Sequence, residues 1–155
     1  MLFKRTFDIL ASFFGLIILS PLLLVAGLLV RFSSEGPVLF RQERTGRHGI
    51  PFTIYKFRTM FVDHGGSSVS VKGEKRITPI GAVLRKFKID EFPELWNILI
   101  GDMSFVGPRP DMPEYAARLQ GKQREILTVR PGLTSPASIK YAREEELLSL
   151  VPDPQ

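Results

Sequence analysis

Two adjacent carboxylates, Asp90 and Glu91, are the side chains of this sequence best suited to covalent chemistry. Such a pair can supply a nucleophile beside a ligand for a metal ion. Pro93 follows, and proline is favoured in the first turn of a helix, where its missing N–H costs nothing. The pair would then face the positive end of that helix, whose free N–H groups bind phosphate. The competing interpretation is a pair that only caps the helix.

A second predicted helix leads directly into this pair. Thr78 and Pro79 are typical of a helix start. The apolar residues that follow recur at the spacing of one buried face: Ile80, Val83, Leu84 and Phe87. Arg85, Lys86 and Lys88 end this helix, so cations and carboxylates meet at the junction of two helices. The cations could bind an anionic substrate or form a solvated helix face.

The remaining elements are predicted from apolar patterns and turn residues. The short apolar run at 38–40 and the partly alternating run at 52–57 flank a turn-rich segment at 45–49, which predicts a short β-hairpin. Residues 63–75 are rich in glycine, serine and charge and are expected to form a loop. A third helix is expected over 113–127.

An uncharged run near the N-terminus predicts a membrane anchor. Ile9 to Val30 contains 22 residues without a charge, enough at about 1.5 Å per residue to cross about 30 Å of hydrocarbon. Basic residues flank the run on both sides and favour the cytoplasmic side of a bilayer. Ser20 and Pro21 lie in its middle, where proline removes a helix hydrogen bond that a serine hydroxyl can partly replace. We therefore predict a re-entrant helix that enters the membrane, bends and returns.

The alternative is a single spanning helix, straight or kinked at the proline. A cleaved signal peptide is disfavoured because the apolar run is longer than about 15 residues and no small-x-small cleavage site follows it. Residues 1–32 are thus expected to be the anchor, and residues 33–155 one compact domain of a mostly helical α+β class, with amphipathic helices at the membrane interface.

Composition narrows the chemistry of that domain. The 155 residues include no cysteine, which excludes disulfides and thiolate metal sites. Residues 31–88 contain 12 Lys and Arg against 4 Asp and Glu, and residues 89–155 contain 7 against 11. The basic part can rest on anionic lipid headgroups or collect an anionic substrate. The aromatic residues are not organised for base stacking, so nucleic acid is not an expected partner.

Motifs spread through the chain resemble the bacterial sugar transferase family, the monotopic phosphoglycosyl transferases. In order, these motifs are Lys4-Arg5-x-Phe7-Asp8, Ser20-Pro21, Gly36-Pro37-Val38 with Phe40-Arg41-Gln42, Lys56-Phe57-Arg58-Thr59-Met60, Arg76-Ile77-Thr78, Leu84-Arg85-Lys86, Asp90-Glu91-x-Pro93-x-Leu95-x-Asn97, Gly101-Asp102-Met103-Ser104 and Val106-Gly107-Pro108-Arg109-Pro110. The resemblance covers residues 3–150.

The resemblance implies transfer of a phospho-sugar from a UDP-sugar to undecaprenyl phosphate, with release of UMP, as a first step of exopolysaccharide or lipopolysaccharide biosynthesis. It implies Mg²⁺, a re-entrant anchor at Ser20 and Pro21, and a catalytic domain on the cytoplasmic face of the bacterial inner membrane. It assigns the nucleophile to Asp90 and a magnesium ligand to Glu91. It assigns substrate contacts to these residues: Arg85 and Arg109, with Pro108, Pro110, Lys56 and Arg58 beside them.

Several matters stay open at this stage. Similar proteins continue past residues 151–155, so the resemblance predicts a shortened C-terminal end. The residues do not decide which sugar is transferred or whether the protein forms a homodimer. The alternative to an enzyme is a non-catalytic, membrane-anchored basic module that binds anionic lipid or an assembly partner, in which Asp90 and Glu91 are only structural.

Overall fold

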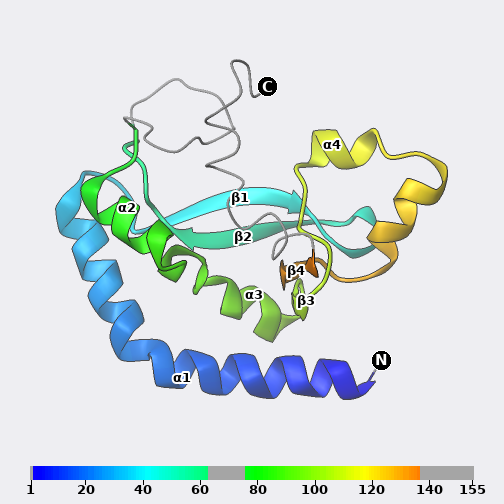
Figure 1. Cartoon of the computed structure of the whole chain (residues 1–155), viewed down its shortest axis with the longest axis horizontal. Helices are drawn as coiled ribbons and strands as arrows, with labels where there is room; N and C mark the ends of the chain where they lie inside the picture. The colour runs from blue at the N-terminus through cyan, green and yellow to red at the C-terminus, as the bar shows by residue number, and fades with distance from the viewer. Residues whose placement is uncertain (1, 63–75, 137–155) are drawn as a thin grey trace.

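A computed structural model describes residues 2–62 and 76–136, so the loop expected at 63–75 lies outside the described residues. The first and longest element is helix α1 (Leu2–Ser33), which runs along one side of the other elements (Figure 1). Short helices and two small sheets make up the rest. The predicted α+β class is confirmed.

Helix α1 is bent but continuous through Pro21. Figure 1 shows two arms that meet at an angle near the middle of the helix. Proline at position 21 has no N–H to donate to the carbonyl of Ile17. The Ser20 hydroxyl donates to that carbonyl instead, at 2.7 Å. The expected bend, with its serine substitute, is therefore present.

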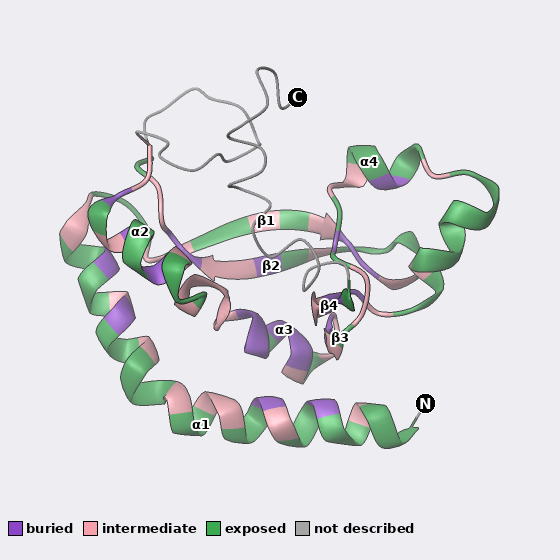
Figure 2. Ribbon diagram, viewed as in Figure 1, coloured by how far each residue is buried: buried purple, intermediate pink, exposed green. Residues whose placement is uncertain are grey.

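Both arms of α1 pack against the same group of elements. Ala26 and Val30, in the second arm, join a cluster with Phe57 and Leu84. In the first arm, Leu16 and Leu19 pack against a second cluster: Ile54, Leu95, Ile98 and Met103. Figure 2 shows the buried residues of α1 on the side that faces the other elements. Most of its other large apolar side chains are exposed, so the helix presents a long apolar surface outward.

Polar contacts attach the N-terminal end of α1 to helix α3 (Glu94–Ile100) and strand β3 (Ser104–Val106). Asp8 is 3% exposed and accepts hydrogen bonds from the Ser104 hydroxyl at 2.8 Å and the Phe105 N–H at 3.3 Å. Arg5 donates to two carbonyls at the end of α3, those of Ile98 at 2.6 Å and Leu99 at 2.8 Å. These bonds satisfy acceptors that a helix end leaves unpaired.

The predicted β-hairpin is confirmed. Strand β1 (Leu39–Thr45) pairs antiparallel with β2 (Pro51–Phe57), with Leu39 opposite Phe57 and Thr45 opposite Pro51. A single helical turn, η1 (Arg47–Gly49), connects the strands. Ile54 and Phe57 of β2 are buried in different clusters, so this strand joins the two parts of the core.

Helix α2 (Pro79–Lys86) begins where the sequence predicts, because the Thr78 hydroxyl accepts the Gly81 N–H at 2.9 Å. The predicted buried stripe is only partly correct. Leu84 is buried and Ile80 packs beside it, whereas Val83 and Phe87 are 51% and 62% exposed. Gly81 lies directly against the backbone of Thr59, where a Cβ atom would collide with the Thr59 carbonyl oxygen. That contact turns the Gly81 and Leu84 side inward.

The single helix expected over 113–127 is wrong. The structure has α4 (Pro113–Ala117) and a separate 3-10 segment, η3 (Gly121–Thr128). Gly121, the first residue of η3, adopts a φ of 51°, which favours glycine and interrupts an α-helix. Strand β4 (Gly132–Thr134) pairs parallel with β3, and the sequence analysis predicted neither strand.

Arg58 closes the C-terminal end of α1. It is 5% exposed, and its guanidinium donates to three backbone carbonyls, those of Val30, Ser34 and Glu35. Arg58→Ala is expected to lower the free energy of unfolding by about 2–4 kcal/mol, because buried acceptors lose a charged donor. Chemical denaturation of the detergent-solubilised protein measures this loss. The control Arg41→Ala, at an exposed position of β1, should lose less than about 1 kcal/mol; equal losses would contradict the capping role.

Candidate functional site

Asp90 and Glu91 lie in a single 3-10 turn, η2 (Ile89–Glu91), between α2 and α3. The turn follows Lys88, which has a left-handed backbone with φ of 57°. Pro93 immediately precedes α3, close to its predicted place, and no side chain caps that helix. Neither carboxylate therefore caps α3, so the capping interpretation finds no support in the geometry.

The Asp90 carboxyl is desolvated. Its Oδ1 atom is buried and has no hydrogen-bond partner within residues 2–62 and 76–136. Burial raises the pKa of Asp90, and the charge of Glu91 raises it further. Three nearby cations lower the pKa of Asp90 and so oppose this shift: Lys56, Lys88 and Arg85. Such a group is unusual outside a functional site, because a buried polar atom normally has a partner.

Glu91 shares one ammonium group with Glu94. Lys56, from β2, places its Nζ 2.9 Å from Glu91 Oε1 and 3.1 Å from Glu94 Oε1. Glu94, from α3, is only 3% exposed. Strand β2 therefore brings one cation to two carboxylates from the neighbouring elements η2 and α3.

The two glutamates respond differently to this environment. Burial would raise the pKa of the Glu91 carboxyl, but the charge of Lys56 and its hydrogen bond hold that pKa below its ordinary value. Burial raises the pKa of Glu94 to about 7 despite the same lysine. Burial also disfavours the charged form of Lys56, yet the two carboxylates raise its pKa.

A hollow of about 340 Å³, open to solvent, adjoins these groups. Its lining comes from both strands of the hairpin, the acidic turn, α3 and the segments around β3 and β4: Arg44, Ile54, Lys56, Glu91, Glu94, Arg109, Pro110, Gly132 and Leu133. Four predicted site residues thus meet at one hollow: Lys56, Glu91, Arg109 and Pro110. This arrangement suits an anionic, phosphate-containing ligand, because arginine and lysine side chains accompany the carboxylates.

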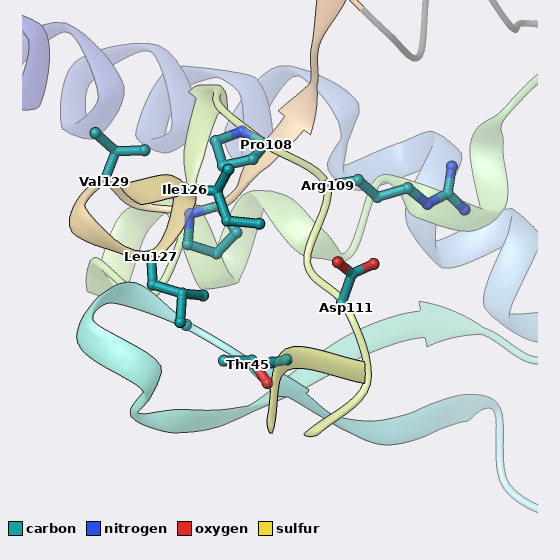
Figure 3. A pocket seen from close by; sticks show the side chains of 10 residues that line it. Thr45, Pro108, Arg109, Asp111, Ile126, Leu127 and Val129 are labelled. Carbon is teal, nitrogen blue, oxygen red and sulfur yellow. The ribbon is translucent and has the colours of Figure 1, made fainter. Parts of the chain in front are cut away.

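Other predicted site residues lie beside this hollow or away from it. Pro108 and Arg109 line a second, mostly apolar hollow with Ile126, Leu127 and Val129 (Figure 3). Figure 3 shows the Arg109 side chain pointing away from those three apolar residues. Arg85 acts on Asp90 through its charge.

One predicted substrate contact, Arg58, is not brought to the acidic turn, and the predicted break of the membrane helix lies within α1. Arg58 lies on the end of α1, where it binds backbone carbonyls instead of lining either hollow. Ser20 and Pro21 form the bend of α1.

Arg44 and Glu94 line the hollow although neither was predicted from the sequence. The available signal for Glu94 was a carboxylate placed among apolar residues three positions after Glu91, at the spacing of neighbours on a helix. Arg44 carried no comparable signal, since it belongs to a generally basic segment. It lies close enough to Arg109 that burial and that second charge lower the pKa of Arg44.

The residues present fit a magnesium ion that is shared with a substrate. In the part of the chain that the structure describes, no group of three or more His, Cys, Asp or Glu is placed to hold a metal ion. Mg²⁺ is commonly bound through only one or two carboxylates together with substrate phosphates. Glu91, in the acidic turn, could supply such a ligand.

Glu94→Gln is expected to flatten the pH dependence of stability. Because its pKa is raised from 4.5 to about 7, the folded protein binds more protons than the unfolded chain in this interval. The free energy of unfolding therefore falls as pH rises through it, by at most about 3 kcal/mol from Glu94. Thermal midpoints of both proteins between about pH 5 and about pH 8 measure the difference. Parallel pH profiles would contradict the assignment.

Comparisons with known proteins agree with the resemblance. Residues 1–150 match the family described as bacterial sugar transferase. The chain is 42% identical to the uncharacterized sugar transferase EpsL of Bacillus subtilis, over 90% of this chain and 69% of that protein. It is 43% identical to a UDP-glucose:undecaprenyl-phosphate glucose-1-phosphate transferase of Caulobacter vibrioides, over 90% of this chain and 54% of that protein.

A third relative, from Aeromonas hydrophila, is a UDP-N-acetylgalactosamine-undecaprenyl-phosphate N-acetylgalactosaminephosphotransferase. The two sequences are 39% identical over a match that includes 89% of this chain and 34% of the relative. The chain thus spans from 34% to 69% of the length of these three proteins. The family match extends over nearly all of this chain, so the resemblance is confirmed: the chain belongs to the bacterial sugar transferase family.

Proposed function

We propose that this chain transfers a phospho-sugar from a UDP-sugar to undecaprenyl phosphate, releases UMP and so begins the assembly of a surface glycan or exopolysaccharide. Two of the relatives have names that give this general reaction, one with glucose and one with N-acetylgalactosamine. The observation that carries the proposal is the Asp90 carboxyl, which has a buried oxygen without a hydrogen-bond partner in the described residues and three cations nearby. No hydrogen bond from the described residues occupies that oxygen.

In the first step, an oxygen of ionised Asp90 attacks the phosphorus that carries the sugar. A bond forms between that oxygen and phosphorus, the bond from phosphorus to the departing uridine nucleotide breaks, and UMP leaves with the electron pair. The product is a phosphoryl-aspartate that carries the sugar. Lys56, Lys88 and Arg85 favour the ionised nucleophile that this step needs.

In the second step, a phosphate oxygen of undecaprenyl phosphate attacks the same phosphorus. The bond from phosphorus to Asp90 breaks, the carboxylate is restored, and the lipid leaves with a diphosphate linkage to the sugar. Two steps avoid a direct encounter between two anionic substrates, because each substrate meets the enzyme in turn.

Charge on the substrates is balanced by residues from several elements. Arg109 and Arg44 at the hollow are placed to bind the diphosphate, and Arg85 lies near the nucleophile. Mg²⁺ held by Glu91 would neutralise charge on the diphosphate and favour departure of the nucleotide.

We also propose that α1 is re-entrant and that its two ends lie on the cytoplasmic side. A helix that crossed about 30 Å of hydrocarbon would place its ends on opposite sides of the membrane. Here Arg5 and Asp8 contact α3 and β3, while Ala26 and Val30 contact β2 and α2. Both arms therefore contact the part of the chain that carries the hollow. Exposed apolar side chains on α2, directly after it and on α3 are suited to the interface: Val83, Phe87, Trp96 and Ile100.

Asp90→Asn is expected to abolish UMP release, because an amide oxygen is a far weaker nucleophile than a carboxylate. The detergent-solubilised protein is incubated with UDP-glucose or UDP-N-acetylgalactosamine, Mg²⁺ and undecaprenyl phosphate, and UMP is measured. Without the lipid, the unmodified protein should release about one UMP per chain and carry a sugar-phosphate adduct on Asp90, detected by mass spectrometry. Glu125→Gln, at an exposed position of η3, is the control and should retain activity. An adduct on another residue would refute the mechanism.

Single cysteines test the re-entrant arrangement, since the natural chain has none. Phe3→Cys and Glu35→Cys lie at exposed positions near the two ends of α1. Both should react with a membrane-impermeant maleimide from the cytoplasmic side only. Ile18→Cys, 73% exposed near the bend, should not react because lipid surrounds it. Reaction of Phe3→Cys only from the outer side would show a spanning helix.

A further inference from the structure

We propose that Lys56 and Glu94 form a positioning pair for Glu91 in the transfer reaction: the buried Glu94 carboxylate holds the Lys56 ammonium, which in turn orients Glu91 beside Asp90. This inference rests on the proposed function. Lys56 was expected to contact the substrate, whereas here its ammonium contacts the carboxylates of Glu91 and Glu94.

The contacts of Lys56 carry the inference. One ammonium lies 2.9 Å from Glu91 Oε1 and 3.1 Å from Glu94 Oε1, within ion-pair distance of both. The side chains of Lys56 and Glu91 are 22% and 20% exposed, whereas that of Glu94 is 4% exposed. Glu94 is thus the more buried partner, and its contact with the Lys56 ammonium is the one that solvent reaches least.

The backbones of these residues are held independently of one another. Lys56 lies in β2, where it pairs with Phe40 of β1, and its strand neighbours Ile54 and Phe57 are core residues. Glu94 is the first residue of α3, whose next residue, Leu95, is buried. The ammonium therefore has a defined position, set by a sheet on one side and a helix on the other.

A held ammonium restricts Glu91, which lies in a turn of only three residues. Because Oε1 accepts a hydrogen bond from Lys56, rotation of the Glu91 carboxylate is limited, and its second oxygen is held in one orientation. A lysine engaged by two carboxylates is also less available to a phosphate. Lys56 would then contribute to turnover through Glu91 more than to binding of the UDP-sugar.

Paired substitutions separate positioning from simple stabilisation. Removing one partner of a buried ion pair leaves an uncompensated charge, whereas apolar replacement of both partners is often neutral. The variants are Lys56→Met, Glu94→Met and the double variant. The exposed pair Arg41→Met with Glu43→Met, on β1, is the matched control. Thermal midpoints are measured together with kcat and KM for the UDP-sugar, using undecaprenyl phosphate and Mg²⁺.

Lys56→Met alone should lower the thermal midpoint by more than about 5 °C. The double variant should return to within about 3 °C of the unmodified protein and still show kcat at least about tenfold lower, with KM changed less than about twofold. The control should keep both kcat and stability.

Three outcomes would overturn the inference. Recovery of both stability and kcat in the double variant would make the pair purely structural. A higher KM with unchanged kcat would make Lys56 a substrate ligand. An unmodified protein that releases no UMP from any UDP-sugar would overturn the proposed function, and this inference with it.

Discussion

Packing of both arms of α1 against the same elements is the constraint on which the rest of the structure depends. The second arm buries Ala26 and Val30 against β2 and α2, and the first arm packs on the cluster that contains Ile98. Strand β2 contributes Ile54 to one cluster and Phe57 to the other. Lys56 lies between these two anchors, so its position near the acidic turn follows from the way the hydrophobic core is built.

The acidic turn shows how three neighbouring carboxyls acquire different properties. The pKa of Asp90 is raised by burial and by the adjacent Glu91. The pKa of Glu91 is lowered by the shared lysine, and that of Glu94 reaches about 7 in the most buried position. Carboxyls with separated pKa values can serve separate roles. In the proposed reaction these are a nucleophile, a metal ligand and a positioning group.

Under the proposed function, the bent helix and the reactive turn address one physical problem, which is chemistry between a lipid phosphate and a water-soluble nucleotide sugar. The proposed re-entrant anchor would keep the catalytic residues at the membrane surface. The outward surface of α1 is apolar, while the hollow beside Glu91 is lined by arginine and lysine side chains. In the proposed reaction, a lipid tail and a diphosphate would therefore meet different surfaces of the same small domain.

Local signals were sufficient for several features of this protein. The sequence alone predicted the α+β class, the apolar N-terminal helix with its bend at Ser20 and Pro21, the hairpin, the Thr78 cap and the acidic pair, because each depends on neighbouring residues or a short repeat. Its order of motifs also indicated the family. The helix expected over 113–127 failed because a glycine with positive φ interrupts it. The parallel pairing of β3 with β4 joins segments too distant for any local pattern.

Long-range packing decided the remaining features of the site. Arg58 belongs to a motif that pointed to substrate, yet the carbonyls it binds become its neighbours only when β2 meets the end of α1. Glu94 became recognisable when folding placed it against Lys56, 38 positions earlier in the chain. Residue types and their spacing determined which groups could react. Burial and contacts between distant segments determined how each group is charged and held, since both depend on neighbours that are brought close only by the tertiary fold.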